Sequence, residues 1–410
     1  MKIMARILSV LLAAAMLPLT GCSGGNAAMS SASSKVASSK AASAAVSADT
    51  NSPEKNDYSK NTYKITETLE KLKINGRYAV TNAGEAGGYL PCITFDNSSA
   101  LLSFNADCEG DISVDMTIET LASDADENKH FLVVVDGAEE RKTVAGKKGM
   151  TVKAVLDVAK GLSRGNHTIE IYRQFEAGQG LCDLISITVN GVITERPKNK
   201  ELFIEFFGDS ITAGYGNLTT VDDEDNTNFS TKSSGTDTYA FLTAKALNAD
   251  MYAVAQSGVA YAWGVGQRDI FHFWSKTTFR RGDLGDYKAE RQPDIVVINL
   301  GTNDHARDNA GEFVYVNKGF TQEQMTEAAV KLLTQVRKDR PNAKIVWFYG
   351  MMGNRIGTQI EAAVEQAGGS AKGFYYLEGE EGHGGGGWHP AKDEHKVNAE
   401  ILTNFIRGIL

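Results

Sequence analysis

Apolar and polar positions alternate with a period of two over much of residues 63–194. The clearest case is residues 112–119, in which every second residue is apolar. Since successive side chains of a strand point to opposite faces, this pattern predicts strands with one buried face. Residues 131–135 and 167–173 also predict strands, the second with Ile169 and Ile171 facing inward, and turn residues such as Asp136-Gly137 separate the runs. Many short strands with frequent turns predict an all-β sandwich domain.

The pattern of apolar and polar positions changes after residue 197. Five short apolar runs predict buried strands, at residues 203–207, 251–255, 295–300, 344–349 and 374–377. Stretches with helical periodicity lie between or after them, at residues 239–248, 322–340, 356–366 and 394–409. Alternating strands and helices predict a parallel sheet covered by helices on both faces. Active sites of such sheets lie beyond the carboxyl ends of the strands, so we expect the chemistry directly after these runs.

Four short motifs stand at or near these strand ends. Gly208-Asp209-Ser210-Ile211-Thr212 follows the first run, Ser257-Gly258 the second and Gly301-Thr302-Asn303-Asp304 the third, while Trp388-His389-Pro390 lies near the C-terminus. Together, and in this order, they resemble the SGNH (GDSL-like) hydrolase superfamily. The resemblance implies a three-layer, flavodoxin-like α/β hydrolase domain.

The residue types in these motifs suit ester hydrolysis. A serine hydroxyl becomes a good nucleophile when a neighbouring base takes its proton, and imidazole titrates near neutrality. We therefore predict Ser210 as the nucleophile and His389 as the base. Attack on an ester carbonyl creates an oxyanion, which requires fixed hydrogen-bond donors. The family motif assigns this oxyanion hole to the backbone N–H groups of Ser210 and Gly258 and to the side-chain amide of Asn303.

One position departs from the superfamily pattern. Most members carry an aspartate three residues before the catalytic histidine, and here that residue is Gly386, within a run of four glycines. Three explanations stay open: a backbone carbonyl orients the imidazole, a more distant acid does so, or the domain is inactive. The distant candidates are Glu380, Glu381 and Asp393.

A narrower resemblance favours the backbone carbonyl. The predicted sandwich leads directly into residues 204–217, and its end carries Gly165-Asn166-His167-Thr168-Ile169, then Arg173 and Glu176-Ala177. Both features resemble carbohydrate esterase family 2, and the likeness covers residues 63–410. It implies a jelly roll before the hydrolase domain and removal of O-acetyl groups from polysaccharides such as xylan and mannan. It also implies a Ser210–His389 dyad in which a main-chain carbonyl orients the histidine through a hydrogen bond. We assign this carbonyl to Gly387.

The residues predicted to contact the substrate are aromatic. Acetylated sugars need a shallow groove with aromatic faces, and Trp388, beside His389, is the main candidate for such a platform. Trp263 and Tyr261, which follow the Gly258 motif, are further candidates, against the alternative that their rings pack in the core. No ordered set of Asp, Glu and His residues has metal-ligand spacing, so we expect neither a metal nor another cofactor.

The N-terminus carries the features of an export signal. Residues 1–21 combine a basic start with an apolar run about half as long as the roughly 20 residues that a bilayer-spanning helix needs. Leu19-Thr20-Gly21-Cys22 resembles the lipobox of bacterial lipoproteins, which implies a lipid anchor on Cys22. An ordinary signal peptide with a chance cysteine is the alternative. Residues 22–62 are rich in Ser, Ala, Gly and Lys, which predicts a disordered tether.

Charge and cysteine content add two limits. A formal net charge of -9 and a pI near 5.4 argue against a nucleic-acid partner, which demands a basic surface. Three cysteines follow Cys22, at positions 92, 108 and 182. Export permits a disulfide, for example between Cys92 and Cys108, but three buried thiols fit the pattern equally well.

These features together predict an extracytoplasmic, membrane-anchored serine esterase. Residues 63–197 would form the sandwich and residues 198–410 the esterase domain. Its partners would be an acetylated polysaccharide or oligosaccharide and, through the lipid on Cys22, the membrane. Two alternatives stay open: an SGNH esterase acting on other acyl esters, such as peptidoglycan O-acetyl groups or lipids, and a non-catalytic carbohydrate-binding lipoprotein.

Overall fold

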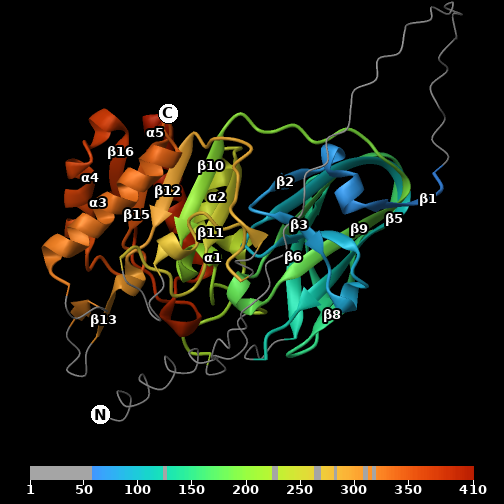
Figure 1. Cartoon of the computed structure of the whole chain (residues 1–410), viewed down its shortest axis with the longest axis horizontal. Coiled ribbons are helices and arrows are strands. Elements are labelled where there is room, and N and C mark those ends of the chain that lie inside the picture. The colour runs from blue at the N-terminus through green and yellow to red at the C-terminus, as the bar shows by residue number, and fades with distance from the viewer. Residues whose placement is uncertain are drawn as a thin grey trace, which may run out of the picture. The chain divides into compact units, whose positions relative to one another are not determined.

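The described part of the chain folds into two main sheets, one antiparallel and one parallel (Figure 1). The computed structural model describes residues 58–122, 127–223, 230–262, 269–280, 284–307, 313–315 and 320–410. The predicted signal peptide, Cys22 and most of the predicted tether lie outside these ranges. Residues 60–62, assigned to the tether from sequence, instead belong to a strand, because their backbone pairs with residues 188–190 of the antiparallel sheet.

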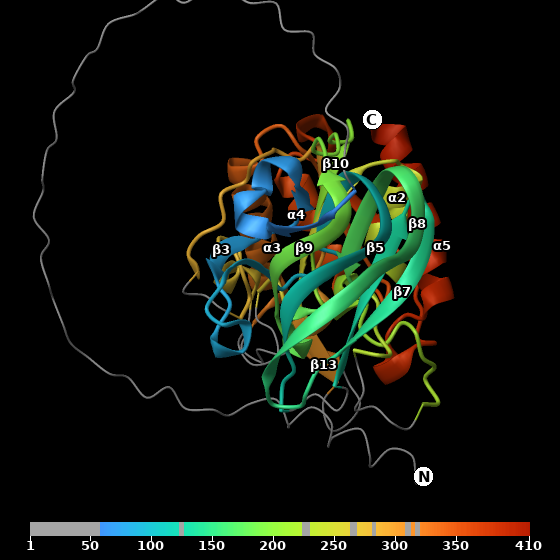
Figure 2. The same cartoon turned by 90° about the vertical axis from the view of Figure 1, so that its right-hand side faces the viewer.

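The antiparallel sheet has nine strands, and its long strands β5, β8 and β9 are seen side by side in Figure 2. Their spatial order is β3-β4-β9-β5-β8-β6-β7, with β1 paired to β9 and β2 paired to β5. Irregularities in the β5–β8 ladder between Cys108 and Ser113 bend these strands. The strands are β1 (Lys60–Lys64), β2 (Lys73–Asn75), β3 (Ala79–Asn82), β4 (Pro91–Phe95), β5 (Leu101–Glu119), β6 (Asn128–Val135), β7 (Ala138–Ala145), β8 (Thr151–Arg173) and β9 (Cys182–Ile193). We call this part of the chain, residues 58–193, the β-domain.

The period of two in residues 112–119 is confirmed by burial. The apolar residues of this segment of β5 are essentially inaccessible to solvent and belong to a single core with β4, β6, β8 and β9. Cys92, Cys108 and Cys182 are buried free thiols, so these three cysteines form no disulfide with one another.

The parallel sheet has the strand order β11-β10-β12-β15-β16. Its strands are β10 (Phe203–Gly208), β11 (Asp250–Ala255), β12 (Ile295–Asn299), β15 (Lys344–Tyr349) and β16 (Phe374–Glu378), and a small hairpin joins β13 (His305–Arg307) to β14 (Phe313–Tyr315). All four pairings between neighbours of the five-stranded sheet are parallel. The five predicted strands are confirmed, with ends that differ by at most one residue.

Helices cover the parallel sheet on both faces, as predicted. The helices are α1 (Ser210–Ala213), α2 (Tyr239–Ala246), α3 (Gln322–Asp339), α4 (Gly357–Gln366) and α5 (Lys392–Ile409). Helices α2 and α5 share one apolar core with the sheet, and α3 and α4 share another core on the opposite face. This three-layer arrangement is the SGNH-type fold, and we call residues 203–410 the α/β domain. None of the helices in the described ranges combines the length and apolar character that a membrane crossing requires.

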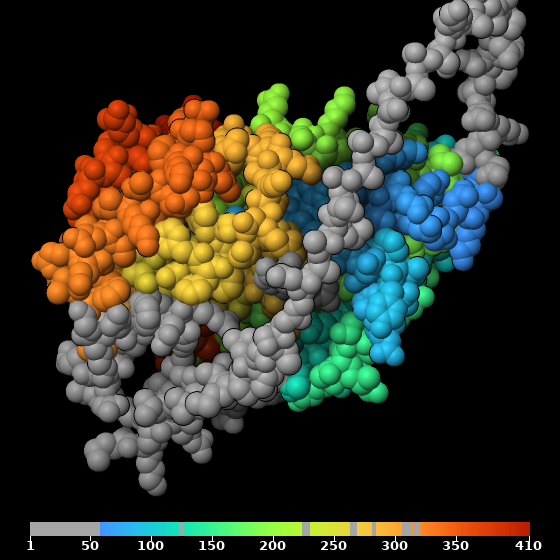
Figure 3. Space-filling view, in the orientation of Figure 1, coloured from blue at the N-terminus to red at the C-terminus, as the bar shows by residue number. Residues whose placement is uncertain are grey.

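A buried charge cluster joins the two domains. Arg77, in the turn between β2 and β3, is 1% exposed and donates hydrogen bonds of 2.8–3.1 Å to three carbonyls of residues 273–276. Its guanidinium also lies 3.6 Å from the carboxylate of Glu205 on β10. Arg340 binds the same carboxylate with two bonds of 2.6 and 2.9 Å. In Figure 3 the blue surface of the β-domain lies against the gold surface of the α/β domain. The domains therefore share buried ionic contacts as well as packing.

Candidate active site

Ser210 stands at the carboxyl end of β10, as the first residue of α1. Asp209 caps this short helix, because its carboxylate accepts a hydrogen bond of 3.0 Å from the backbone N–H of Ile211. Gly208 is required by close packing: a Cβ at this position would lie 2.0 Å from the hydroxyl oxygen of Thr212. These contacts fix a sharp turn from strand to helix, with the serine hydroxyl at the edge of the sheet.

His389 lies against this serine. Its Nε2 is 2.8 Å from Ser210 Oγ, although 179 residues separate the two in sequence. Its Nδ1 is 3.1 Å from the carbonyl oxygen of Gly387, the acceptor expected from the sequence. Since a carbonyl can only accept, Nδ1 carries the proton and Nε2 offers its lone pair to the serine hydroxyl. This is the tautomer that a general base requires.

The glycine run explains why no aspartate precedes this histidine. The N–H of Gly386 donates to the carbonyl of Gly216 at 2.9 Å, and a Cβ at position 386 would lie 2.6 Å from Cγ2 of Thr219. At Gly385 a Cβ would lie 2.9 Å from the Gly216 carbonyl oxygen. The loop of residues 216–219 therefore occupies the space that an aspartate side chain would need.

The three distant acids proposed from the sequence lie elsewhere. Glu381 pairs with His383 at 2.8 Å, and the backbone N–H of Glu380 is bound by the side chain of Asn398 at 2.9 Å. Among the hydrogen bonds and ion pairs of the described residues, none joins Glu380, Glu381 or Asp393 to His389. In this structure the Gly387 carbonyl is the group that orients the imidazole.

Burial lowers the pKa of His389 to about 4, and the carbonyls of Gly387 and Gly386 oppose that shift. A base must be neutral, so activity is retained above this pKa and lost as the pH falls through it. We expect the acid limb of kcat/KM for an acetyl ester to lie near pH 4, well below the value of an ordinary imidazole. A pH–rate profile of the wild-type enzyme measures this. An acid limb near neutrality would instead indicate a carboxylate that stabilises the imidazolium form.

Gly258 lies in a β-turn directly after β11. Ser257 and Gly258 are its central residues, and the N–H of Val259 closes it on the carbonyl of Gln256 at 3.3 Å. The φ of Gly258 is +83°, the value that the second central position of a type II turn requires. Among the hydrogen bonds recorded for the described residues, none uses the backbone N–H of Gly258 or of Ser210 as donor. An oxyanion hole requires donors of this kind, which protein acceptors do not already engage.

Asn303 lies in the 3₁₀ turn η8 (Thr302–Asp304) after β12. Its Nδ2 donates to the carbonyl of Val259 at 2.9 Å and lies 3.2 Å from the Asp209 carboxylate. Burial raises the pKa of Asp209 to about 7.

Asp304 accepts hydrogen bonds from the N–H groups of Tyr261 and Ala262, so it braces the loop that follows Gly258. Asn303 thus links the third motif directly to Asp209 of the first motif and to Val259, the residue after Gly258.

The aromatic candidates separate into different environments. Trp388 is 61% exposed beside His389, as a substrate platform requires. Tyr261 is only 1% exposed and packs edge-to-face against Trp347, so its assignment to the substrate surface is wrong and its ring belongs to the core. Trp263 lies outside the described residues. Tyr215, not assigned a role from sequence, lies with its ring centroid 4.7 Å from that of His389.

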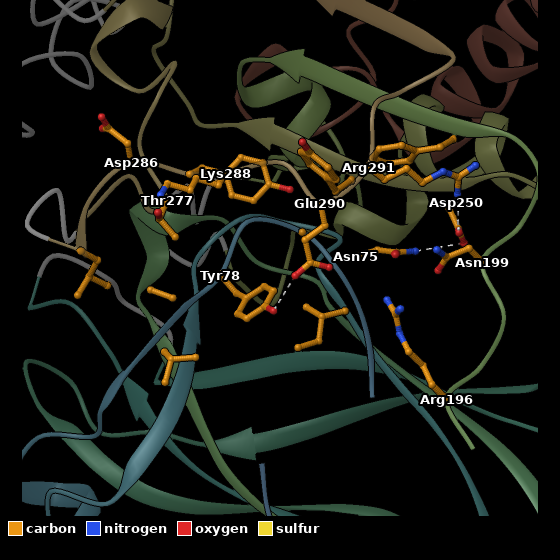
Figure 4. Close-up of a pocket in the computed structure, with 18 residues that line it drawn as sticks. Asn75, Tyr78, Arg196, Asn199, Asp250, Thr277, Asp286, Lys288, Glu290 and Arg291 are labelled. Atoms are coloured by element: carbon orange, nitrogen blue, oxygen red, sulfur yellow. Dashed lines mark hydrogen bonds and ion pairs between the residues drawn. The ribbon is translucent and has the colours of Figure 1, made fainter. Parts of the chain in front are cut away.

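A separate cavity of about 460 Å³ lies where β10 and β11 begin, at the opposite end of these strands from Ser210 (Figure 4). Its walls combine the β-domain near Tyr78 with residues 284–291 of the α/β domain. The described residues that line it include neither serine nor histidine, and Tyr78 bonds Glu290 at 3.2 Å. It therefore offers no counterpart to the Ser210–His389 pair.

Comparison with known proteins supports the same family. Residues 206–377 match the GDSL-like Lipase/Acylhydrolase family, a segment that contains Ser210, Gly258 and Asn303. The chain is 29% identical over 298 residues to the Cellulase/esterase CelE of Acetivibrio thermocellus, covering 68% of this chain and 34% of that protein. It thus spans about a third of CelE. It is 26% identical over 259 residues to an acetylxylan esterase / glucomannan deacetylase of Cellvibrio japonicus, covering 60% of this chain and 68% of that protein.

Solved structures share the fold over most of the chain. A family two carbohydrate esterase from Clostridium thermocellum in complex with cellohexaose matches with a TM-score of 0.68 and 24% identity, covering 83% of this chain and 100% of that one. An acetyl xylan esterase from the rumen bacterium Butyrivibrio proteoclasticus matches with a TM-score of 0.67 and 22% identity, covering 85% and 98%. Residues 206–377 of the α/β domain thus match the GDSL-like Lipase/Acylhydrolase family, and the chain as a whole is similar to the carbohydrate esterases of family 2.

Proposed function

We propose that this protein is a serine esterase that removes O-acetyl groups from polysaccharides by means of a Ser210–His389 dyad. The observation that carries the proposal is the contact of 2.8 Å between Ser210 Oγ and His389 Nε2, with Nδ1 of the same ring on the Gly387 carbonyl. Nucleophile, base and orienting group thus form one hydrogen-bonded chain, the arrangement that activates a serine. The names of the relatives, a cellulase/esterase and an acetylxylan esterase, point to the same reaction class.

In the first half of the reaction Ser210 Oγ attacks the acetyl carbonyl carbon while its proton moves to His389 Nε2. The carbonyl oxygen becomes an oxyanion. His389 then gives the proton to the sugar oxygen, the ester bond breaks, and the deacetylated sugar leaves with an acetyl group remaining on Ser210. The imidazolium that forms between these steps is stabilised by the carbonyl dipole of Gly387 in place of a carboxylate charge.

In the second half a water molecule attacks the acetyl-serine. His389 takes a proton from the water and then returns it to Ser210 Oγ, which releases acetate and restores the free enzyme. Both halves pass through an oxyanion, which the N–H groups of Ser210 and Gly258 would bind. The amide of Asn303 would complete the hole, with the oxyanion replacing the Asp209 carboxylate as the second acceptor of Nδ2.

The surroundings of the dyad favour a sugar over a long acyl chain. The exposed ring of Trp388 beside His389 presents an apolar face of the kind on which a pyranose ring stacks. We propose that it forms the substrate platform, and that the antiparallel β-domain is the jelly roll typical of the family. The likeness to an esterase solved in complex with cellohexaose supports a substrate with several sugar units.

The substrate proposal predicts a clear preference. The wild-type protein should release acetate from acetylated xylan, glucomannan or both, and should hydrolyse acetyl esters faster than octanoyl esters of the same alcohol. Acetate release from these two polysaccharides and from cell wall, measured side by side, tests this. A preference for octanoyl esters, or acetate release from cell wall alone, would favour a lipase or a peptidoglycan esterase.

We also propose that the protein acts at the cell surface. Cys22 would carry the lipid, and residues 23–59 would serve as the tether between the membrane and the β-domain. Replacement of Cys22 by serine in the full chain, followed by fractionation of cells, would release the protein from the membrane fraction if Cys22 is the anchor.

A further inference from the structure

Glu176 of the β-domain reaches the loop that holds Gly258. It lies between β8 and the 3₁₀ turn η4 (Ala177–Gln179) and is 4% exposed. One carboxylate oxygen accepts the backbone N–H of Ser257 at 2.6 Å, and the other accepts the hydroxyl of Ser257, also at 2.6 Å. A buried carboxylate from one domain is therefore bound at both oxygens by a single residue of the other domain, directly before the predicted oxyanion donor.

Glu176 is itself held rigidly. Its carbonyl accepts a hydrogen bond of 3.0 Å from the fully buried guanidinium of Arg173, and its N–H donates to the side chain of Gln179 at 3.2 Å. Arg173 also binds the carbonyls of Phe175 and Gly180, at 2.7 and 2.6 Å, so the whole loop is fixed to the end of β8. These hydrogen bonds thus fix the backbone position from which the Glu176 carboxylate reaches Ser257.

The turn that Glu176 binds has a peptide group that can rotate. Type I and type II turns share their first φ and differ by roughly half a turn of the central peptide, here the one between Ser257 and Gly258. The N–H of that peptide is the Gly258 group assigned to the oxyanion hole. Because Gly258 has no Cβ, and a Cβ there would meet no atom within 4 Å, sterics alone do not hold this peptide. A hydrogen bond to Ser257, the residue before Gly258, can hold the peptide in one orientation.

We propose that Glu176 is a positioning residue for the esterase reaction, whose carboxylate fixes the Ser257-Gly258 turn with the Gly258 N–H directed at the oxyanion. This inference rests on the proposed function. It gives the β-domain a part in catalysis that is separate from any binding of sugar, because the α/β domain alone would lack this carboxylate. It also accounts for a buried acid that the Ser210–His389 dyad does not use.

Replacement of Glu176 by alanine should lower kcat for an acetyl ester by about 10²–10³, the cost of one oxyanion donor, with KM almost unchanged. Glu176→Gln should keep most of kcat, because its amide can still accept from the Ser257 N–H. The matched control is Asp96→Asn. Asp96 is an equally buried β-domain carboxylate that crosses to the α/β domain, but it binds the N–H of Arg280 at 3.0 Å, in a segment outside the catalytic motifs.

The control separates positioning from a general loss of structure. Asp96→Asn should leave kcat unchanged even where it lowers the melting temperature. A kcat of Glu176→Ala equal to that of the wild type, or a loss matched by Asp96→Asn, would overturn the inference.

Hydrogen exchange gives a readout that does not need activity. In Glu176→Ala the amide of Ser257 loses its acceptor and should exchange faster than in the wild type, while peptides of β10 keep their protection. If the wild type turns over no ester, the proposed function fails, and the exchange measurement decides on the turn by itself. Unchanged exchange at Ser257 would then overturn the role of Glu176.

Discussion

Replacement of His389 by alanine is expected to lower kcat for an acetyl ester by about 10⁶, because Ser210 would lose the base that accepts its proton. The fold should survive, since the imidazole makes its two hydrogen bonds at the rim of the site and not in either core. KM should change little, because the role proposed for the imidazole is proton transfer and not substrate binding. Steady-state kinetics with a chromogenic acetyl ester measure both parameters.

The dyad should also behave as one unit. The double variant Ser210→Ala/His389→Ala should be scarcely slower than either single variant, because each replacement already removes the whole proton-transfer path. A suitable control is His383→Ala, on the same loop, whose ring binds Glu381 and the Trp388 carbonyl. Its kcat should remain near that of the wild type. Losses that multiply in the double variant would contradict the dyad, since Ser210 and His389 would then act independently.

The second large effect concerns stability. Glu205→Gln should lower the free energy of unfolding by about 3–5 kcal/mol, the usual cost of removing one partner from a buried ion pair. Glu205 is fully buried and is bound by Arg340 and by the hydroxyl of Tyr252, with Arg77 of the β-domain 3.6 Å away. Without the carboxylate charge, two guanidinium groups would stay buried without an anion. Urea denaturation of the purified variant measures the loss.

A surface pair provides the contrast. Asp111 and Lys160 form an ion pair at 3.5 Å in which both side chains are largely exposed, so Asp111→Asn should leave the free energy of unfolding almost unchanged. If Glu205→Gln cost less than about 1 kcal/mol, the range of an exposed pair, the cluster would not hold the two domains together.

Local patterns in the sequence predicted the architecture of the α/β domain well. The five strands and the helices between them were recognisable because each buries a continuous apolar run or stripe. The rule that active sites follow the carboxyl ends of parallel strands then placed Ser210, Gly258 and Asn303 near one another. The motif order supplied His389, which no local pattern connects to Ser210.

The features that differ from the sequence predictions share a physical cause. Whether Tyr261 faces solvent depends on the packing of Trp347, 86 residues later, and periodicity says nothing of such contacts. Glu176 was recognisable only as part of a resemblance, because its partner Ser257 lies 81 residues away in the other domain. Residues 60–62 have the composition of a tether, but β9 offers them a strand edge to pair with. In each case a distant partner decides the environment.

The lack of an aspartate at position 386 was visible in the sequence, but its reason was not. Only the close approach of residues 216–219 to the glycine run shows that this loop excludes a side chain there. The same approach helps to set the backbone at Gly387, where a φ of +63° brings the carbonyl near Nδ1 of His389. The glycine run is thus part of the backbone arrangement that orients His389 in place of an aspartate carboxylate.

Turnover of a chromogenic acetyl ester by the wild-type protein and by Ser210→Ala tests the central claim most directly. We predict measurable hydrolysis by the wild type and a loss of about 10⁶ in kcat when the nucleophile is removed. No hydrolysis by the folded wild-type protein, or equal rates for the two proteins, would contradict the assignment of this site as a serine esterase.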